Sequence, residues 1–369
     1  MSIELEIQLV AVVVSMSCAL AGVFLVLRRL ALMSDAISHT VLLGIVIAFF
    51  ITQDIASPFL VLGAALMGVA TVGLVELLQR TRLVREDASI GLVFPALFSI
   101  AVILISRFAG NVHLDTDAVL LGEIAFAPFR RLEVGGRDLG PRTLYVMGGI
   151  LLLNAAAIGL FYKELKLSTF DPALAAALGF SPVLLHYGFM TLVSITAVGA
   201  FDAVGSILVV GLMIAPPATA YLLSERLPVV LLLSVLIAAA AAIIGFWAAW
   251  FMDASIAGSM ATAAGLLFLL AFLFSPQRGV VAEARRRVRQ RWEFARLMLA
   301  IHLLHHEGTP EYANEAREAH LREHLRWAPA FAERVVRQSV DAGFVVRQGE
   351  LLELTETGRD AARGAMAAG

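Results

Sequence analysis

Asp35 and His39 are the two side chains of this sequence that are best placed to do chemistry. They lie four residues apart in an apolar run that continues to Phe50. In a membrane helix a carboxylate costs a few kcal/mol or more to bury, so one that is kept there usually has a function. A spacing of four places both side chains on one face of a helix, about one turn apart. A carboxylate oxygen and an imidazole nitrogen on one face suit a divalent metal such as manganese, iron or zinc.

The composition is that of a membrane protein. The chain has 369 residues, of which 59% are hydrophobic and 16% are charged, whereas a soluble globular protein carries about 25% charged residues. The single cysteine, Cys18, excludes an internal disulfide bond and a thiolate cluster. No cleavable signal peptide is evident, because the first apolar run is long and has no basic segment before it.

A helix that spans a membrane needs about 20 apolar residues, and the sequence predicts nine such helices. Gly205, Gly211 and the pair Pro216 and Pro217 predict a seventh span that packs closely and then kinks or breaks. The nine predicted ranges are 6–27, 31–52, 56–77, 88–107, 143–162, 184–202, 204–223, 228–252 and 255–275.

The expected fold class is an all-α polytopic membrane protein, with about nine transmembrane helices, followed by a small α+β domain. We expect a transmembrane domain at 1–276, a basic juxtamembrane linker at 277–291 and a C-terminal domain at 292–369. More than half of the 28 lysines and arginines and most of the eight histidines follow residue 276. The linker lies next to the membrane, where a basic run favours anionic lipid.

The basic loops predict the orientation in the cell membrane. Arginine or lysine follows the first, third, fifth, seventh and ninth spans, which share one side if the spans alternate. Cytoplasmic loops are enriched in these residues, so that side is predicted to be the cytoplasm. The N-terminus is then outside and the C-terminal domain is in the cytoplasm. The segment 108–142, predicted to be outside, also carries arginines, but its acidic residues keep the net charge small.

A short polar segment at 163–180 lies between the fifth and sixth spans. Asp171 or Thr169 can cap a short helix there, Pro172 suits its first turn, and Gly179 suits its end. A short amphipathic helix on the cytoplasmic side is either a docking element for another protein or an interfacial helix that lies on lipid. Periodicity alone does not separate these two interpretations.

Three stretches together resemble the permeases of ABC-type manganese, zinc and iron importers, a branch of the ATP-binding cassette family. They are residues 27–39, 163–179 and 204–220, in the order and spacing of that family. The resemblance implies that Asp35 and His39 lie on the metal path. It also implies that the second stretch is a coupling segment that contacts an ATPase, and its matching residues are Phe170, Asp171, Pro172, Ala173, Leu178 and Gly179.

The same resemblance implies partners. The chain has no phosphate loop of the Gly-x-x-x-x-Gly-Lys-Ser/Thr kind, so ATP hydrolysis is expected on a separate cytoplasmic ABC ATPase and not on this permease. An extracytoplasmic metal-binding protein would deliver the ion. A second permease subunit, identical or homologous, would complete the pathway. No permanently bound cofactor is expected, and Mn²⁺, Zn²⁺ or Fe²⁺ would be the transported ion.

Other polar residues are weaker candidates. His113, Asp115 and Asp117 alternate, so they would face one way in an extended strand and line an outer entrance for the ion; a docking surface or a solvated loop is the alternative. Asp202, at the predicted outer turn between spans six and seven, is either near that entrance or a helix cap. His186 is interpreted as an interfacial residue at the start of span six.

The pattern after the linker resembles the winged-helix part of metal-dependent repressors of the diphtheria-toxin-repressor type. Some manganese and zinc permeases are similar in carrying such an extension. The expected elements are helices at about 292–306, 315–326 and 329–342, a hairpin at 344–354 with its turn at Gln348 and Gly349, and a last helix that starts at Thr355 or Thr357.

The role of this extension stays open. It has nearly as many acidic as basic residues, which is a weak electrostatic footprint for nucleic acid, so DNA binding is not expected. A regulatory or docking role against the ATPase is favoured. A cytoplasmic metal sensor is the alternative, and simple solvated helix faces are the default. The sensor would use His302, His305 and His306, which lie within about one turn, and the i,i+4 pair His320 and His324.

The leading hypothesis is therefore a metal-ion permease, with two alternatives. An ABC permease for a metal chelate, such as a siderophore or cobalamin, would need a wider path and no Asp-x-x-x-His pair. A membrane-bound, metal-responsive sensor would use the winged-helix domain as its output, and a gene that stands apart from ATPase and binding-protein genes would favour it.

Overall fold

The computed structural model describes residues 2–54, 57, 59–108, 124–134, 137–318, 320–321 and 325–368. The chain divides into two compact units, Met1–Gly279 and Val280–Gly369. Within the described residues, nine helical segments are long and apolar enough to cross a membrane. The prediction of a helical, polytopic membrane unit is therefore confirmed.

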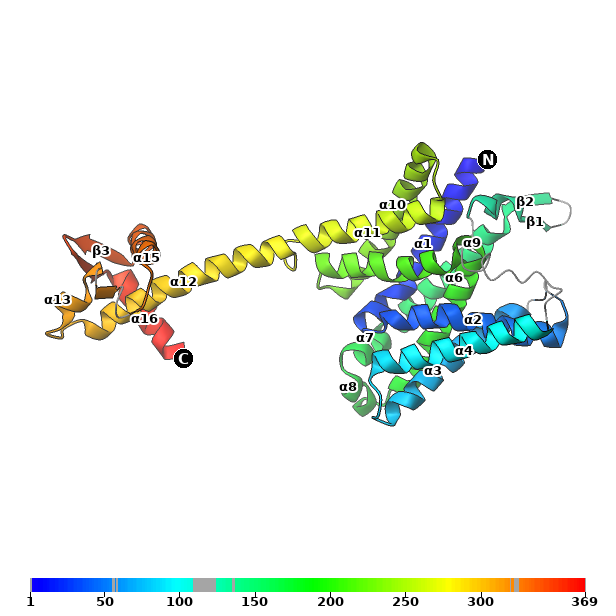
Figure 1. Cartoon of the computed structure of the whole chain (residues 1–369), viewed down its shortest axis with the longest axis horizontal. Coiled ribbons are helices and arrows are strands. Elements are labelled where there is room, and N and C mark those ends of the chain that lie inside the picture. Colours follow the sequence, from blue (N-terminus) through cyan, green and yellow to red (C-terminus); the bar gives the residue numbers. More distant parts are fainter. Residues whose placement is uncertain are drawn as a thin grey trace. The chain divides into compact units, whose positions relative to one another are not determined.

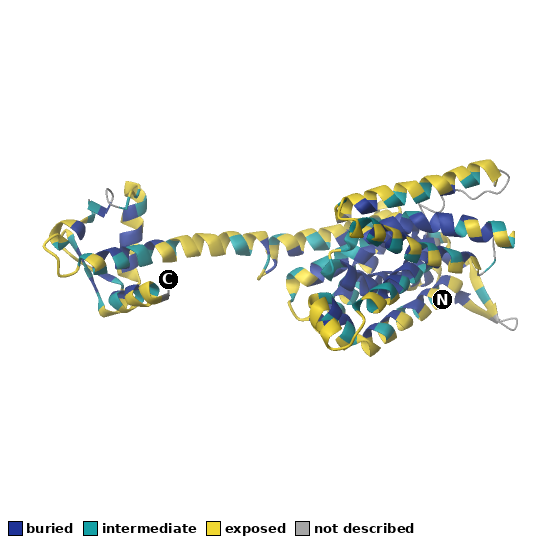
Figure 2. Cartoon of the chain, turned by 90° about the horizontal axis from the view of Figure 1, so that it is seen from below, coloured by how far each residue is buried: buried dark blue, intermediate teal, exposed yellow. Residues whose placement is uncertain are grey.

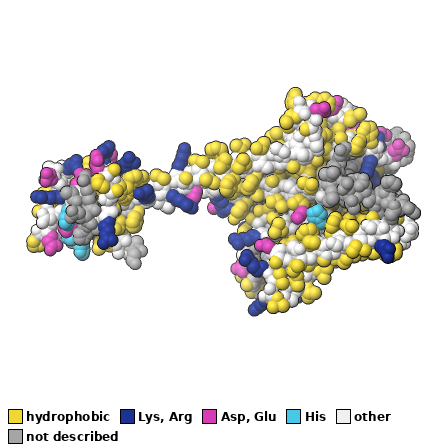
Figure 3. Space-filling view, in the orientation of Figure 1, with side chains coloured by type: hydrophobic (Ala, Val, Ile, Leu, Met, Phe, Trp, Pro, Cys, Tyr) yellow, Lys and Arg dark blue, Asp and Glu magenta, His cyan; other side chains and the backbone are white. Residues whose placement is uncertain are grey.

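The helices of the first unit lie close to their predicted ranges. Helix α9 contains two of the nine spans, Pro182–Phe201 and Ala203–Leu223. Figure 3 shows hydrophobic side chains spread over much of one face of this unit, as a lipid-facing surface requires. The bounds are α1 Ile3–Leu27, α2 Ala31–Thr52, α3 Phe59–Arg80, α4 Glu86–Phe108, α6 Arg142–Leu160, α9 Pro182–Leu223, α10 Leu227–Met252 and α11 Ile256–Phe274.

Helix α1 is the centre of the first unit. It packs against α6, α9 and α10 (Figure 1), and it is the most buried of the spanning helices. Figure 2 shows the buried residues gathered inside this helical bundle. Gly22 allows α9 to approach α1 closely, because a Cβ atom there would lie 1.9 Å from the carbonyl oxygen of Met213. Small residues serve this purpose where helices cross in a membrane.

The sixth and seventh spans follow each other without a loop, and the described backbone of α9 is interrupted only at a non-helical residue, Gly205. Gly205 has φ 74° and ψ 165°, which is non-helical and is readily adopted only by glycine. The sequence predicted a kink or a break at Pro216 and Pro217; the break is wrong, because α9 continues through both prolines to Leu223. Membrane helices tolerate proline where neighbouring groups satisfy the freed carbonyls. Close packing at Gly211 is also not found, since a Cβ there would meet no atom within 4 Å.

The region between α4 and α6 contains elements that the sequence did not predict. They are the 3-10 helix η1 (Ile124–Phe129) and an antiparallel hairpin of β1 (Arg131–Val134) and β2 (Arg137–Pro141). Arg131 forms a bidentate ion pair with Glu6 of α1, at 3.0 Å and 3.3 Å, and a second pair with Asp138. Arg131 belongs to the segment 108–142, which is predicted to be outside the cell although it carries arginines. The carboxylates of Glu6 and Asp138 balance the charge of this arginine.

The second unit combines helices with a hairpin. Strands β3 and β4 pair in antiparallel register, with Val345 opposite Leu354, and Gly349 at their turn has φ 64°. The hairpin and the last helix therefore lie where the sequence predicted them, whereas identification as a winged helix stays a prediction. The bounds are α12 Val280–His306, α13 Tyr312–Glu315, α15 Pro329–Asp341, β3 Val345–Gln348, β4 Leu351–Leu354 and α16 Glu356–Ala368.

Two expectations for this unit differ from the structure. The basic run 285–291 belongs to α12, which begins at Val280 and not at residue 292. Arginine, alanine and glutamate favour helix, and Glu283 pairs with Arg287 one turn later at 3.1 Å. The predicted helix over 315–326 is interrupted: the short helix α13 ends at Glu315, the backbone is helical again at Glu318, His320 and Leu321, and residues 319 and 322–324 lie outside the described part.

Candidate functional site

The structure brings Asp35 and His39 together on α2. His39 Nε2 lies 3.5 Å from Asp35 Oδ1, and the two side chains are 28% and 42% exposed, respectively. The pair thus presents an oxygen and a nitrogen ligand at the surface of the single chain and not inside its core. Two ligands from one chain are too few to enclose a metal ion, because such ions take four or more ligands in proteins.

Aromatic side chains of α4 hold the imidazole of His39. Its ring stacks on Phe94 with a centroid distance of 5.6 Å and meets Phe98 edge-on at 5.8 Å. The far side of α2 is fixed to α3, where Thr71 Oγ1 donates to Thr40 Oγ1 at 2.7 Å. Helix α2 is therefore supported by both neighbours while the Asp35 carboxylate remains accessible.

The segment between α6 and α9 folds as two short helices, α7 (Tyr162–Phe170) and α8 (Pro172–Ala177), which we call the α7–α8 segment. Asp171 caps α8 by accepting a hydrogen bond from the Leu174 backbone N–H at 2.9 Å, with Pro172 in the first turn. Gly179, at φ 86°, follows the end of α8. Capping is the role expected of Asp171, whereas the alternative cap, Thr169, lies inside α7.

The side chains predicted to contact an ATPase are all exposed. Phe170 and Leu178 are each 61% exposed, so each presents a large apolar surface at the end of a helix. Exposed apolar groups next to polar ones are typical of a protein interaction site. The other exposed residues of the predicted set are Asp171, Pro172, Ala173 and Gly179.

Arg28, at the end of α1, ties the α7–α8 segment to the spanning helices. Its Nε donates to Thr169 Oγ1 and its Nη2 donates to Ser168 Oγ, each at 3.0 Å. Its Nη1 lies 3.3 Å from His186 Nδ1 on α9, and its guanidinium lies over the ring of Phe189, 5.4 Å from the centroid. One side chain thus joins α1, α7 and α9.

Glu76 extends this network to α3. Its Oε1 lies 2.8 Å from His186 Nε2, and its Oε2 accepts a hydrogen bond of 2.6 Å from the hydroxyl of Tyr187. The sequence did not predict this network: Arg28 was considered only as a basic residue after the first span and as part of the matching stretch 27–39, and His186 only as an interfacial residue. Glu76 carried a usable signal, because a carboxylate inside an apolar span rarely lacks a partner.

The predicted outer-entrance residues receive no structural support. His113, Asp115 and Asp117 lie outside the described residues. Asp202 belongs to α9 and precedes the break at Gly205 by three residues. Its side chain lies outside the described part of the structure. An outer entrance therefore stays a prediction.

Comparison with known proteins agrees with this geometry. Residues 4–275 match the ABC 3 transport family. The zinc transport system membrane protein TroD of Treponema pallidum (strain Nichols) is 51% identical over 354 residues, which cover 96% of each chain. The manganese transport system membrane protein MntD of Bacillus subtilis (strain 168) is 45% identical over 295 residues, which cover 80% of this chain and 100% of MntD.

A solved structure supports the same assignment. The structure described as PsaBC from Streptococcus pneumoniae in complex with Fab matches with a TM-score of 0.63 and 27% identity, over 75% of this chain and 94% of that chain. The match to the family covers the whole spanning unit, from the start of α1 to the end of α11. This chain therefore belongs to the ABC 3 transport family, as a multi-pass membrane permease related to metal transport proteins.

Proposed function

We propose that this chain is the permease subunit of an ATP-binding cassette importer that moves Mn²⁺, Zn²⁺ or Fe²⁺ into the cytoplasm. The observation that carries the proposal is the Asp35–His39 pair, whose oxygen and nitrogen ligands lie 3.5 Å apart on a spanning helix that has no other acidic, basic or histidine side chain. The relatives named for zinc and for manganese support the same substrate class. Asp plus His accepts all three ions, and the order of affinities favours zinc over manganese.

A second permease subunit faces the Asp35–His39 pair in this proposal. A carboxylate that is 42% exposed on a spanning helix cannot face lipid without a cost of several kcal/mol. A second chain, identical or homologous, placed across a two-fold axis removes that cost and brings the number of ligands to four. Four ligands contributed by two chains coordinate an ion loosely enough to release it, as transport requires.

The α7–α8 segment docks on a cytoplasmic ATPase in this proposal. Phe170 and Leu178 supply the apolar contact, and Arg28 supplies the connection to the membrane, because it holds α7 against α1 and α9. The basic residues that follow alternate spans support a cytoplasmic position for this segment and for the C-terminal unit, with the N-terminus outside. An extracytoplasmic binding protein would deliver the ion to the opposite face.

Metal accumulation in cells tests the proposal. Cells that express the transporter with Asp35→Ala or His39→Ala are expected to lose uptake, because each change removes a ligand from a four-ligand path. Thr262→Ala, which also removes a polar group from a spanning helix but lies on α11, is the matched control and should retain uptake. Elemental analysis of the cells gives the metal content, and immunoblotting confirms equal amounts of permease. Undiminished uptake in both path variants would refute the proposal.

A further inference from the structure

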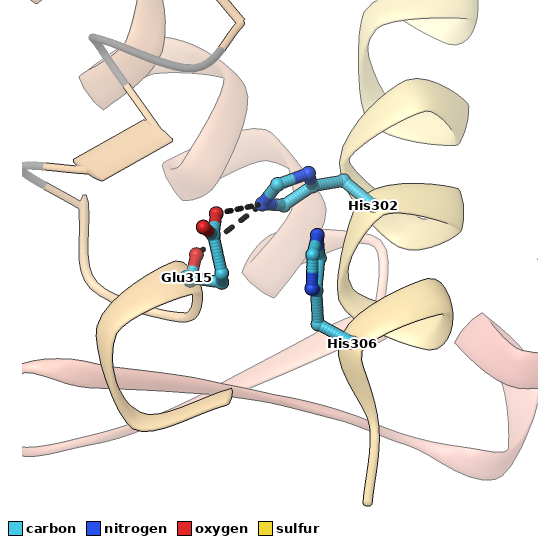
Figure 4. Close-up of side chains that lie close together, drawn as sticks. All are labelled: His302, His306 and Glu315. Carbon is cyan, nitrogen blue, oxygen red and sulfur yellow. Dashed lines mark hydrogen bonds and ion pairs between the residues drawn. The ribbon is translucent and has the colours of Figure 1, made fainter. Parts of the chain in front are cut away.

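A second group of metal-binding side chains lies in the C-terminal unit. His302 and His306 are one turn apart on α12, with ring centroids 4.9 Å apart, and Glu315 comes from α13. One ligand atom from each residue lies within 4.8 Å of those of the other two. Figure 4 shows the imidazole of His302 directed at the carboxylate of Glu315, with His306 beside it. His302 Nε2 and Glu315 Oε2 are 3.4 Å apart.

A third imidazole reaches the same carboxylate from outside. His320 Nε2 lies 3.0 Å from Glu315 Oε1. The ligands of a bound metal are commonly oriented in this way, by a hydrogen bond to a polar group that does not itself contact the metal. His305 does not belong to the cluster, since its side chain is exposed, and His324 lies outside the described residues.

Two of the three ligands lie in the core of the C-terminal unit, and the third, His306, is half-buried. His302 is 8% exposed and Glu315 is 9% exposed. Their sequence neighbours Leu303 and Ala316 are fully buried, as is Leu299, one helical turn before His302. Taking a carboxylate and imidazoles out of water is costly unless they are paired or coordinate a metal. The surrounding apolar shell also limits access of water, which strengthens the attraction between a cation and these ligands.

We propose that His302, His306 and Glu315 form a binding site for a divalent transition metal, which binds Zn²⁺ more tightly than Mn²⁺ or Fe²⁺. Two imidazoles and one carboxylate are a ligand set that zinc accepts, with a fourth position left open for water or for another side chain. Of the three candidate transported ions, zinc stands highest in the order of affinities for such ligands. His320 is a positioning residue that holds the carboxylate.

The site is separate from the transport path and suits a sensor. If the C-terminal unit lies in the cytoplasm, an assumption that rests on the proposed function, the site meets the ion after its passage. Metal bound there joins α12 to α13. Helix α13 is in turn tied to the hairpin, where the Tyr312 hydroxyl donates to the Leu352 carbonyl at 3.0 Å. Binding would therefore stiffen the whole unit, which gives imported metal a means of acting back on the transporter.

Zinc binding to the purified full-length chain tests the site. The Asp35→Ala and His39→Ala substitutions are included, so that the proposed path ligands do not contribute. We expect about one Zn²⁺ per chain by elemental analysis after dialysis against chelator-buffered Zn²⁺. His306→Ala and Glu315→Gln should each weaken binding by about 100-fold or more, because loss of a ligand exceeds the 10–100-fold effect of losing an outer partner. His320→Ala should fall within that smaller range.

His305→Ala is the matched control, because it removes an exposed imidazole from the same turn of α12. It should bind zinc as the parent does; equal binding by His305→Ala and His306→Ala would overturn the site. Circular dichroism of metal-free protein shows whether a variant has lost its fold. The visible spectrum of Co²⁺ bound to the parent provides a measurement that needs no variant, and a spectrum without imidazole coordination would also overturn the proposal. This experiment measures zinc binding and not transport, so its failure would overturn the metal site without bearing on the proposed permease function.

Discussion

Arg28 and Thr169 lie 141 residues apart in the sequence, yet the Arg28 guanidinium donates a hydrogen bond of 3.0 Å to the Thr169 hydroxyl. This contact joins the end of the most buried spanning helix to the exposed α7–α8 segment. Three residues after Thr169 the chain reaches Pro172 and the start of α8. A movement of the α7–α8 segment would therefore be expected to displace α1, because the planar guanidinium of Arg28 connects the two.

Arg28→Ala should uncouple the α7–α8 segment from the membrane helices. Each hydrogen bond to a charged group contributes about 1.5–3 kcal/mol, and Arg28 makes two to α7 alone. We expect metal uptake to fall more than ATP hydrolysis by the assembled transporter. Arg28→Lys should rescue only in part, because an ammonium group cannot reproduce the fork.

The neighbouring Arg29 provides the control, since it is also basic but has an exposed side chain. Arg29→Ala should leave the ratio of transport to ATP hydrolysis unchanged. If Arg28→Ala and Arg29→Ala give the same ratio in one reconstituted preparation, Arg28 does not couple the two parts.

Phe170→Ala should weaken the association of the permease with its ATPase without unfolding the chain. Phe170 is 61% exposed, so little packing within the chain is lost, whereas an aromatic side chain at the centre of an interface commonly contributes 2 kcal/mol or more, which is about 30-fold in affinity. Co-purification of the two subunits measures the effect. Leu83→Ala is the control, because Leu83 is 88% exposed in the loop between α3 and α4. Full retention of the ATPase by Phe170→Ala would exclude this docking surface.

Gly22→Ala should destabilise the membrane unit. The added Cβ would lie 1.9 Å from the carbonyl oxygen of Met213, so α1 and α9 must move apart, and overpacking of this kind costs about 1–3 kcal/mol or more. Gly149→Ala in α6 makes the same chemical change where no atom lies within 4 Å. The control should be neutral or slightly stabilising, because alanine favours helix over glycine. Thermal unfolding in detergent compares the two, and equal melting temperatures would contradict the close approach.

Features that depend on neighbours in sequence could be predicted from the sequence. The apolar runs predicted the spanning helices, the spacing of four brought Asp35 and His39 together, and Asp171 was one of the two caps predicted for the helix that starts at Pro172. Contacts between distant segments could not be predicted, because no local pattern links Arg28 to Thr169. Glu315 was missed for the same reason: the histidines of α12 were noted, but their carboxylate partner comes from another element.

The break at Gly205 shows a different limit. Proline was expected to interrupt α9, since it cannot donate a backbone hydrogen bond, yet the helix continues through Pro216 and Pro217 and breaks at Gly205. In a membrane helix, neighbouring groups can compensate for proline, whereas the backbone conformation at Gly205, with φ 74° and ψ 165°, is readily adopted only by glycine. Whether α9 is interrupted at the glycine or at the prolines depends on how the neighbouring helices pack, and that packing cannot be predicted from the sequence.

Uptake by proteoliposomes that contain the permease, its ATPase and internal ATP, with the binding protein outside, tests the role of Asp35 and His39 most directly. Permeases with and without the Asp35→Ala and His39→Ala double substitution are compared for accumulated Mn²⁺, Zn²⁺ and Fe²⁺ by elemental analysis. We predict that the double variant still assembles with its ATPase and hydrolyses ATP but accumulates none of the three ions above the level of liposomes without ATP. Accumulation at the rate of the unsubstituted permease would contradict a metal path through these two residues.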